Sequence, residues 1–163
     1  MTEGKSHPEE VAAAVARMDE FVALGLVGQH AVAERLGLNV TDLTCLGHVL
    51  GAGDTPLTAG ALAARAGLTT GAVTGVLGRL ERAGYAHRQP DPGDRRRVRV
   101  VADPAAAARL AAAYGPFYER LHQLFAGYAP AELAVLTDWF GRAASLMRDS
   151  VAEIRSSPAL TGG

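Results

Sequence analysis

Apolar residues recur every three or four positions along both ends of the chain, a spacing that is typical of amphipathic helices. Near the N-terminus this spacing is carried by Val11, Val15, Met18 and Val22. It predicts a first helix over residues 7–36, and the pair Ser6 and Glu9 has the form of a capping box at its start. Gly25 and Gly28 are expected to bend or interrupt this helix, because glycine is a weak helix former.

A similar apolar stripe runs through residues 103–155, where it predicts two further helices. Asp103 and Pro104 have the form of an N-cap and a first helical residue, and Pro116 is expected to kink the helix that they open. Pro130 is expected to open the last helix of the chain.

The two terminal regions carry more apolar surface than a small central unit can cover. Residues 7–36 and 103–155 flank a short segment, residues 41–101, and the surplus surface predicts a homodimer whose interface joins both ends of the chain. Residues 1–163 are expected to form a single domain, because the length suits one core. The tail, residues 156–163, is expected to be disordered.

Shorter elements are predicted between the two ends. Thr41 is expected to cap a short second helix. Two further helices are expected to begin at Thr58 and at Thr69 or Thr70, and the second should end before Gly84. The small, turn-forming and apolar residues that a helix-turn-helix needs at its contact are Ala63, Gly67, Val73 and Val76. An ordinary helical hairpin is the alternative interpretation.

A β-hairpin is predicted directly after this pair of helices. Residues 85–89 and 97–101 have high β propensity, and "PDPGD" between them is typical of a turn. A helix-turn-helix followed by a hairpin is a winged helix, in which one helix enters the major groove of DNA and the wing reaches phosphates or the minor groove. The predicted fold is therefore mainly α with a small β-hairpin wing, a winged helix-turn-helix flanked by N- and C-terminal dimerisation helices.

Positive charge is concentrated in this central segment, although the net charge of the chain is only −1. Residues 58–101 hold eight basic and three acidic side chains, whereas residues 1–57 hold three basic and eight acidic ones. The "RRRVR" of residues 95–99 places four arginines in five positions at the wing. A solvated hairpin without a partner would be expected to mix charges of both signs, so the pattern favours a DNA-binding wing.

Other classes of protein fit the sequence poorly. No signal peptide or membrane-length apolar run is visible, so the protein is expected in the cytoplasm, away from the membrane. Cys45 is the single cysteine, and its spacing to the five histidines fits no metal site, so neither a metal nor another cofactor is expected. The sequence also lacks paired carboxylates near a histidine, a nucleophile elbow and a phosphate-binding loop, so an enzyme is not expected.

Residues 55–101 resemble the core of the MarR family of bacterial transcription regulators. The resemblance rests on "LTAGALAARAGL", "GAVTGVLGRLERAGY", Arg88 and "DPGDRRRVRV". It implies a symmetric homodimer that binds a pseudo-palindromic operator in double-stranded DNA, usually as a repressor that a small phenolic or lipophilic effector, or oxidation, releases. The chain departs from the family after the wing, where Ala102 and Asp103 replace the common Leu-Thr pair.

The resemblance also assigns roles to individual residues. Asp94 and Arg96 match an Asp-x-Arg pair at the wing tip, where the aspartate orients the arginine for the minor groove. Arg95 and Arg97 are expected to bind phosphates beside it. The remaining residues expected to contact DNA lie on or near the recognition helix: Thr58, Thr69, Thr70, Gly71, Thr74, Arg79, Arg82 and Arg88. Of these, Arg79 and Arg88 are candidate contacts to the DNA backbone.

The predicted recognition helix has an unusual DNA-facing side. On a helical wheel, this side is lined by Gly71, Gly75 and Gly78. We hypothesise that bare backbone lets the helix sit deep in the groove, while Thr70, Thr74 and Arg82 read bases directly and DNA shape under the wing supplies much of the specificity. A coding bias toward glycine is the alternative explanation.

Three matters stay open at this point. A winged helix can serve protein contacts without operator recognition, and Cys45 can act as a redox sensor or as an ordinary structural thiol. No effector-binding residue can be assigned, although polar groups near the predicted dimer helices include His30, His48, Tyr114, Tyr118 and His122.

Overall fold

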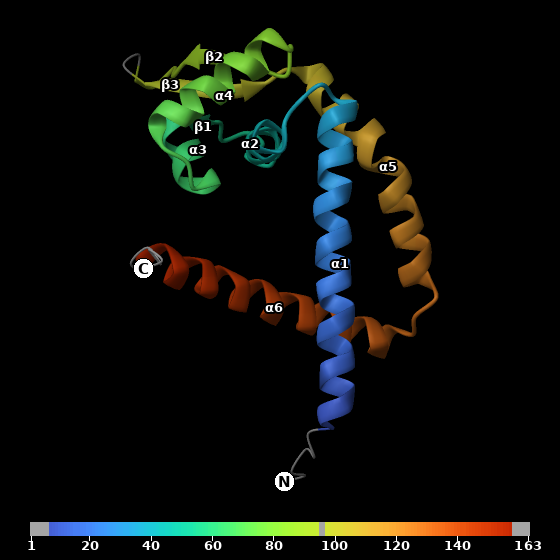
Figure 1. Ribbon diagram of the computed structural model, residues 1–163. Coiled ribbons are helices and arrows are strands. Elements are labelled where there is room, and N and C mark those ends of the chain that lie inside the picture. Colours follow the sequence, from blue (N-terminus) through green and yellow to red (C-terminus); the bar gives the residue numbers. More distant parts are fainter. Residues whose placement is uncertain (1–6, 95–96, 158–163) are drawn as a thin grey trace. The chain divides into compact units, whose positions relative to one another are not determined.

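A computed structural model describes residues 7–94 and 97–157 of the chain (Figure 1). In chain order the elements are α1 (Pro8–Arg35), α2 (Val40–Leu50), β1 (Leu57–Thr58), α3 (Ala59–Ala66), α4 (Thr70–Arg82), β2 (Ala86–Pro90), β3 (Val98–Ala102), α5 (Pro104–Ala126) and α6 (Pro130–Ser156). The chain forms two compact units, Met1–Gly115 and Pro116–Gly163, and their boundary lies within α5. The fold is mainly helical with a small sheet, as the sequence predicted.

The core of the first unit lies where α2, α3 and α4 pack against one another and against the sheet. Its fully buried side chains include Leu46 of α2, Leu62 of α3, Leu77 and Leu80 of α4, and Val100 of β3. Figure 1 shows α3 and α4 gathered beside β2 and β3. Burial of each of these aliphatic side chains contributes about 1.5–3 kcal/mol, so the core fixes α4 firmly within the unit.

The sheet has three antiparallel strands in the order β1-β3-β2. β2 and β3 form the predicted hairpin, each one residue further along the chain than the sequence indicated. β1 was not predicted; it pairs Leu57 with Val100 and Thr58 with Arg99 on the other side of β3. A strand of two residues is too short to show an alternating pattern in the sequence.

The predicted helix-turn-helix is confirmed as α3 and α4. The side chain of Thr58 accepts the Ala61 N–H at 3.1 Å, and that of Thr69 accepts the Ala72 N–H at 3.2 Å, so both threonines are N-caps. Gly67 in the turn has a φ of 66°, a left-handed conformation that other residues adopt only with strain. The turn therefore requires a glycine here, as expected.

The predicted start of α2 was wrong. Asn39 caps this helix, because its side-chain oxygen accepts the Asp42 N–H at 2.8 Å, and Thr41 lies inside the first turn. Both residues carry side chains that can cap a helix, so the sequence alone did not separate them. The extended backbone of Asn39, with φ −92° and ψ 168°, is what makes it the cap.

α1 runs without a break through Gly25 and Gly28, contrary to the predicted interruption. A glycine keeps the backbone groups that a helix needs, and its weak propensity is easily overridden in a long helix. His7 is the N-cap of α1 and makes no side-chain capping bond within the part of the chain described. The predicted capping residue, Ser6, lies outside the described residues.

α5 begins as predicted, with the Asp103 carboxylate accepting the Ala105 N–H at 2.9 Å. The helix continues through Pro116 to Ala126. α6 begins at Pro130, also as predicted, and ends at Ser156. Most of the tail predicted to be disordered, residues 158–163, lies outside the described residues.

The helices at both ends leave large apolar side chains exposed within one chain. On α1 these include Val15, Phe21, Leu24 and Val27. On α5 and α6 they include Phe117, Leu124, Val135, Trp139, Leu146, Met147 and Ile154. No helix in the described part of the chain has both the length and the apolar character needed to span a membrane.

Candidate nucleic-acid interface

α4 has one buried face and one exposed face. The buried face carries Val73, Val76, Leu77 and Leu80, as the helical wheel predicted. On the opposite side Gly71 and Gly75 are exposed and Gly78 is half-buried. A Cβ added at Gly71 or Gly78 would meet nothing within 4 Å. The exposed face therefore presents backbone with open space beside it.

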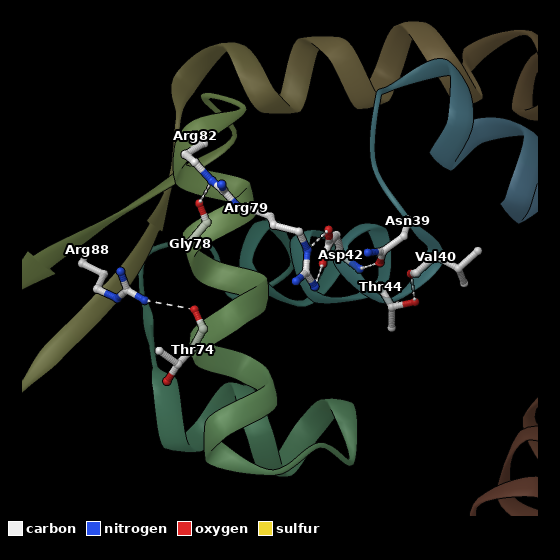
Figure 2. A network of polar contacts seen from close by, with 9 residues as sticks. All are labelled: Asn39, Val40, Asp42, Thr44, Thr74, Gly78, Arg79, Arg82 and Arg88. Carbon is white, nitrogen blue, oxygen red and sulfur yellow. Dashed lines mark hydrogen bonds and ion pairs between the residues drawn. The ribbon is translucent and has the colours of Figure 1, made fainter.

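The residues predicted to read bases, Thr70, Thr74 and Arg82, are all exposed on α4. The Thr74 hydroxyl donates to the Thr70 carbonyl at 3.0 Å, and the Arg82 Nε donates to the Gly78 carbonyl at 3.1 Å (Figure 2). These bonds engage one donor of each side chain. An arginine carries five N–H donors and a hydroxyl oxygen still accepts, so both side chains retain groups that can bind DNA.

Arg79 is joined to Asp42 of α2 by two hydrogen bonds (Figure 2). Its Nε donates to Oδ2 at 2.8 Å and its Nη2 donates to Oδ1 at 2.7 Å. The Arg79 side chain is 42% exposed, whereas the Asp42 side chain is 2% exposed. The hydrogen bond to Asp42 raises the pKa of Arg79 above its ordinary value. A residue expected to contact the DNA backbone thus also holds α4 against α2.

Arg88 of β2 links the wing to α4 in a similar way. Its backbone N–H donates to Oε1 of Glu81 at 3.1 Å, and its Nη1 donates to Oε2 at 2.5 Å. Its Nη2 lies 3.5 Å from the Thr74 carbonyl (Figure 2). In this view Arg88 reaches α4 on the side away from Asp42. The recognition helix is therefore tied on one side to α2 and on the other side to the wing.

The base of the wing is organised by a buried carboxylate, Asp91, which is 7% exposed. Its Oδ1 accepts the N–H groups of Gly93 at 2.7 Å and Asp94 at 3.3 Å. Its Oδ2 accepts the Arg99 Nε at 2.7 Å. The Arg99 guanidinium, followed by the Gly93 N–H, lowers the pKa of Asp91. Arg99, one of the four arginines in residues 95–99, thus stabilises the turn of the wing.

The tip of the wing is described in part. The Arg97 N–H donates to the Asp94 carbonyl at 2.8 Å, and both residues are exposed. Arg95 and Arg96 lie outside the described residues, so their contacts with DNA stay predictions.

Three carboxylates that shape this surface were not identified from the sequence. Asp42, Glu81 and Asp91 each hold an arginine, at separations of 37, 7 and 8 residues along the chain. The sequence did hold a signal for Asp42, because it is the one charged residue in the stretch "TDLTCL", which alternates threonines with buried apolar residues. A buried charge nearly always has a partner, but the sequence does not say which one.

An open cavity of about 470 Å³ borders the Asp42–Arg79 pair. Its lining consists of Gly37, Leu38, Asn39, Asp42, Arg79, Arg82 and Ala83. The histidines and tyrosines near the predicted dimer helices do not line this cavity; they are His30, His48, Tyr114, Tyr118 and His122. In the described part of the chain no group of histidine, cysteine and acidic residues is placed to hold a metal ion.

Cys45 lies in the core beside this pair and is fully buried. Burial raises the pKa of its thiol, the Asp42 charge raises it further, and the Arg79 charge opposes both. A protonated, inaccessible thiol is a poor nucleophile, which supports the structural interpretation of Cys45 over the redox-sensor alternative.

Comparison with known sequences points in the same direction as the geometry. Residues 36–97, from the end of α1 into the wing, match the MarR family model. The chain is also 38% identical to YcgE of Bacillus subtilis (strain 168), an uncharacterized HTH-type transcriptional regulator, over 125 residues. That match covers 77% of this chain and 80% of YcgE.

Solved structures show the same fold at low identity. MarR of E. coli in its apo form has a TM-score of 0.57 at 23% identity, covering 78% of this chain and 95% of MarR. A mutant of S. aureus MepR bound to an oligodeoxyribonucleotide has a TM-score of 0.58 at 19% identity, covering 83% of this chain and 97% of MepR. A second MepR mutant reaches a TM-score of 0.68 at 17% identity, with 82% and 96% of the two chains covered. The sequence and structure matches are to transcription regulators, not to enzymes.

Proposed function

The chain belongs to the MarR family of transcription regulators, with a DNA-binding winged helix, and we propose that it acts as a homodimeric repressor of a pseudo-palindromic operator. We further propose that a small phenolic or lipophilic effector releases it from DNA.

Operator binding is supported above all by the link between α4 and the wing. Arg88 joins β2 to Glu81 of α4 through two hydrogen bonds, so a helix with an exposed face and a basic hairpin lie side by side and are linked directly. This is the arrangement needed to place a helix in the major groove while a wing reaches the flanking backbone or minor groove. Arg82 on the helix and Arg97 on the wing are both exposed, so Arg82 can reach base edges while Arg97 binds a phosphate.

Dimerisation is supported by the apolar side chains that one chain leaves exposed. Phe21 of α1, Trp139 of α6 and Ile154 of α6 are examples, and Ile154 is 73% exposed. Large apolar side chains exposed along α1, α5 and α6 favour a partner chain that covers them. A two-fold dimer would place two copies of α4 about 34–36 Å apart, which matches successive major grooves on one side of the duplex.

Repression and effector release are proposed from family membership alone.

The first experiment tests operator binding itself, with the purified protein and the DNA upstream of its own gene, in a gel-shift assay with excess nonspecific competitor. Selection of bound sequences from a random duplex pool then identifies the site. We expect a palindrome with half-site centres about 10 base pairs apart. Binding without sequence preference would favour a winged helix used for protein contacts.

The wing is tested by Arg96→Ala, which we expect to weaken operator binding by about 1–3 kcal/mol because a minor-groove contact is lost. Arg95→Ala and Arg97→Ala serve as comparisons and should mainly reduce the salt dependence of binding, since each removes a phosphate contact. Equal affinity of the wild type and Arg96→Ala would remove the wing tip from the mechanism.

A further inference from the structure

Asp42 is buried in α2, and its charge is matched across the core by Arg79 of α4. Removing a carboxylate from water costs several kcal/mol unless good hydrogen bonds compensate the loss. Both of its oxygens accept a hydrogen bond from Arg79, at 2.7 and 2.8 Å. A buried apolar residue would fill the same place at lower cost, so the pair calls for an explanation beyond packing.

The pair fixes the orientation of a side chain on the DNA-facing surface. A free arginine samples many rotamers, whereas two parallel bonds to one carboxylate hold the guanidinium in a single plane. The bonds use Nε and Nη2, and Nη1 lies 3.5 Å from the position that a Cβ on Gly75 would take. Gly75 is exposed and lies one turn before Arg79. The guanidinium therefore lies beside the exposed Gly75, at ordinary van der Waals distance from the position of an added Cβ.

The position of Arg79 on the helix indicates what it meets. At about 100° per residue, Arg79 lies to one side of the stripe formed by Gly71, Gly75 and Gly78. When the stripe faces the floor of the groove, a side chain at its flank faces the wall, where the phosphates lie. A guanidinium with two donors held by a carboxylate can offer the others to a phosphate oxygen.

We propose that Asp42 is a positioning residue for operator recognition: from inside the fold it holds the Arg79 guanidinium in the one orientation that binds a phosphate at the wall of the major groove. Asp42 itself does not touch DNA. The inference rests on the operator binding proposed above. It adds that the register of α4 on the duplex is set from α2, through this ion pair.

The direction in which Asp42→Asn changes the affinity for the operator distinguishes a positioning role from a purely electrostatic one. Asp42→Asn removes a negative charge near the DNA-facing surface, so Coulomb's law alone predicts tighter binding to every duplex. Loss of a positioning residue predicts the opposite for the operator, because Arg79 then meets the phosphate in many orientations. Random duplex, which demands no fixed register, should bind unchanged or more tightly.

The experiment measures the Kd for the operator and for a random duplex of equal length, at several salt concentrations, for the wild type, Asp42→Asn and Asp54→Asn. Asp54→Asn is the matched control, because it makes the same charge change at an exposed residue. For Asp42→Asn we expect the ratio of the two Kd values, random over operator, to fall by about tenfold, which corresponds to about 1.4 kcal/mol. Asp54→Asn should keep the wild-type ratio.

If Asp42→Asn does not fold, the same proposal can be tested with Arg79→Lys. Lysine retains the charge opposite Asp42 but cannot make two parallel bonds, so the same loss of the ratio is expected with little loss of folding stability. Circular dichroism and stoichiometric titration with DNA give the folded, active fraction of each variant. A wild-type ratio in a folded Asp42→Asn or Arg79→Lys variant would overturn the positioning role alone. A wild type that does not prefer its operator would overturn operator binding and this inference together.

Discussion

At the base of the wing, Arg99 donates to Asp91 while the other oxygen of Asp91 accepts two backbone N–H groups of the turn. Two further carboxylates hold an arginine, Asp42 with Arg79 and Glu81 with Arg88, and there both carboxylate oxygens accept from the same arginine residue. A dense run of arginines is therefore not a uniform DNA-binding patch. Arg99 holds the turn of the wing, whereas Arg97 is exposed and can bind a phosphate.

Asp91 should make folding stability depend on pH. Its pKa is lowered in the folded state, chiefly by Arg99, so its contribution is present above the carboxyl's unfolded value of about 3.9 and is lost as pH falls through the lower folded value. As the pH is lowered from about 4, we expect the urea concentration at the unfolding midpoint to decrease more steeply for the wild type than for Asp91→Asn, which lacks this carboxylate. Parallel curves for the two proteins would show that Asp91 contributes no such linkage.

At the scale of elements, α4 is held between α2 and the wing. The contact with the wing is tested by a double-mutant cycle with Glu81→Gln, Arg88→Gln and the double variant, followed by urea unfolding. Because both side chains are about one third exposed, we expect a coupling free energy of about 0.2–1 kcal/mol. Operator affinity should fall in both single variants, since each loosens the wing from the helix. Strictly additive effects on stability would mean that the pair does not join the two elements.

The glycines on α4 are expected to lower the stability of the helix and to improve its fit to the major groove. A Cβ at Gly78 would meet nothing within 4 Å, so Gly78→Ala should raise the free energy of unfolding by up to about 1 kcal/mol through helix propensity. If bare backbone lets the helix sit deep in the groove, the same methyl group should weaken operator binding. Gly25→Ala in α1, where an added Cβ also meets open space, is the control for stability without a change in affinity. Unchanged affinity of Gly78→Ala would favour coding bias as the origin of the stripe.

At the scale of the whole molecule, operator recognition depends on two copies of α4 acting together. Ile154 is 73% exposed on α6, and Ile154→Glu places a charge in the proposed dimer interface. We expect sedimentation to show a shift toward monomer, with weaker operator binding because only one half-site is then held at a time. Ser145→Glu is the control, since Ser145 is exposed and, at about 100° per residue, lies on the opposite face of α6. A dimeric Ile154→Glu variant would place the interface elsewhere.

The sequence by itself determined helices α1 to α6, the hairpin and their order, but not β1. Apolar spacing predicted the long helices, and Gly67 predicted the turn between α3 and α4. The start of α3 was predicted at Thr58 and that of α4 at Thr69 or Thr70, of which Thr69 is the cap. The hairpin and its basic tip were equally visible, and together they predicted a winged helix. All of these signals are local, because a helical stripe, a cap or a tight turn is encoded within a few neighbouring residues.

Only the tertiary structure decided which charges meet. Asp42 and Arg79 are 37 residues apart, and nothing in either local sequence selects the other as a partner. β1 exists only because Leu57 and Thr58 lie beside β3, and Asn39 rather than Thr41 caps α2 because its backbone is the extended one. Such pairings follow from how the core closes. Periodicity along the chain tells which face of an element is buried, but it carries no information about what lies against that face.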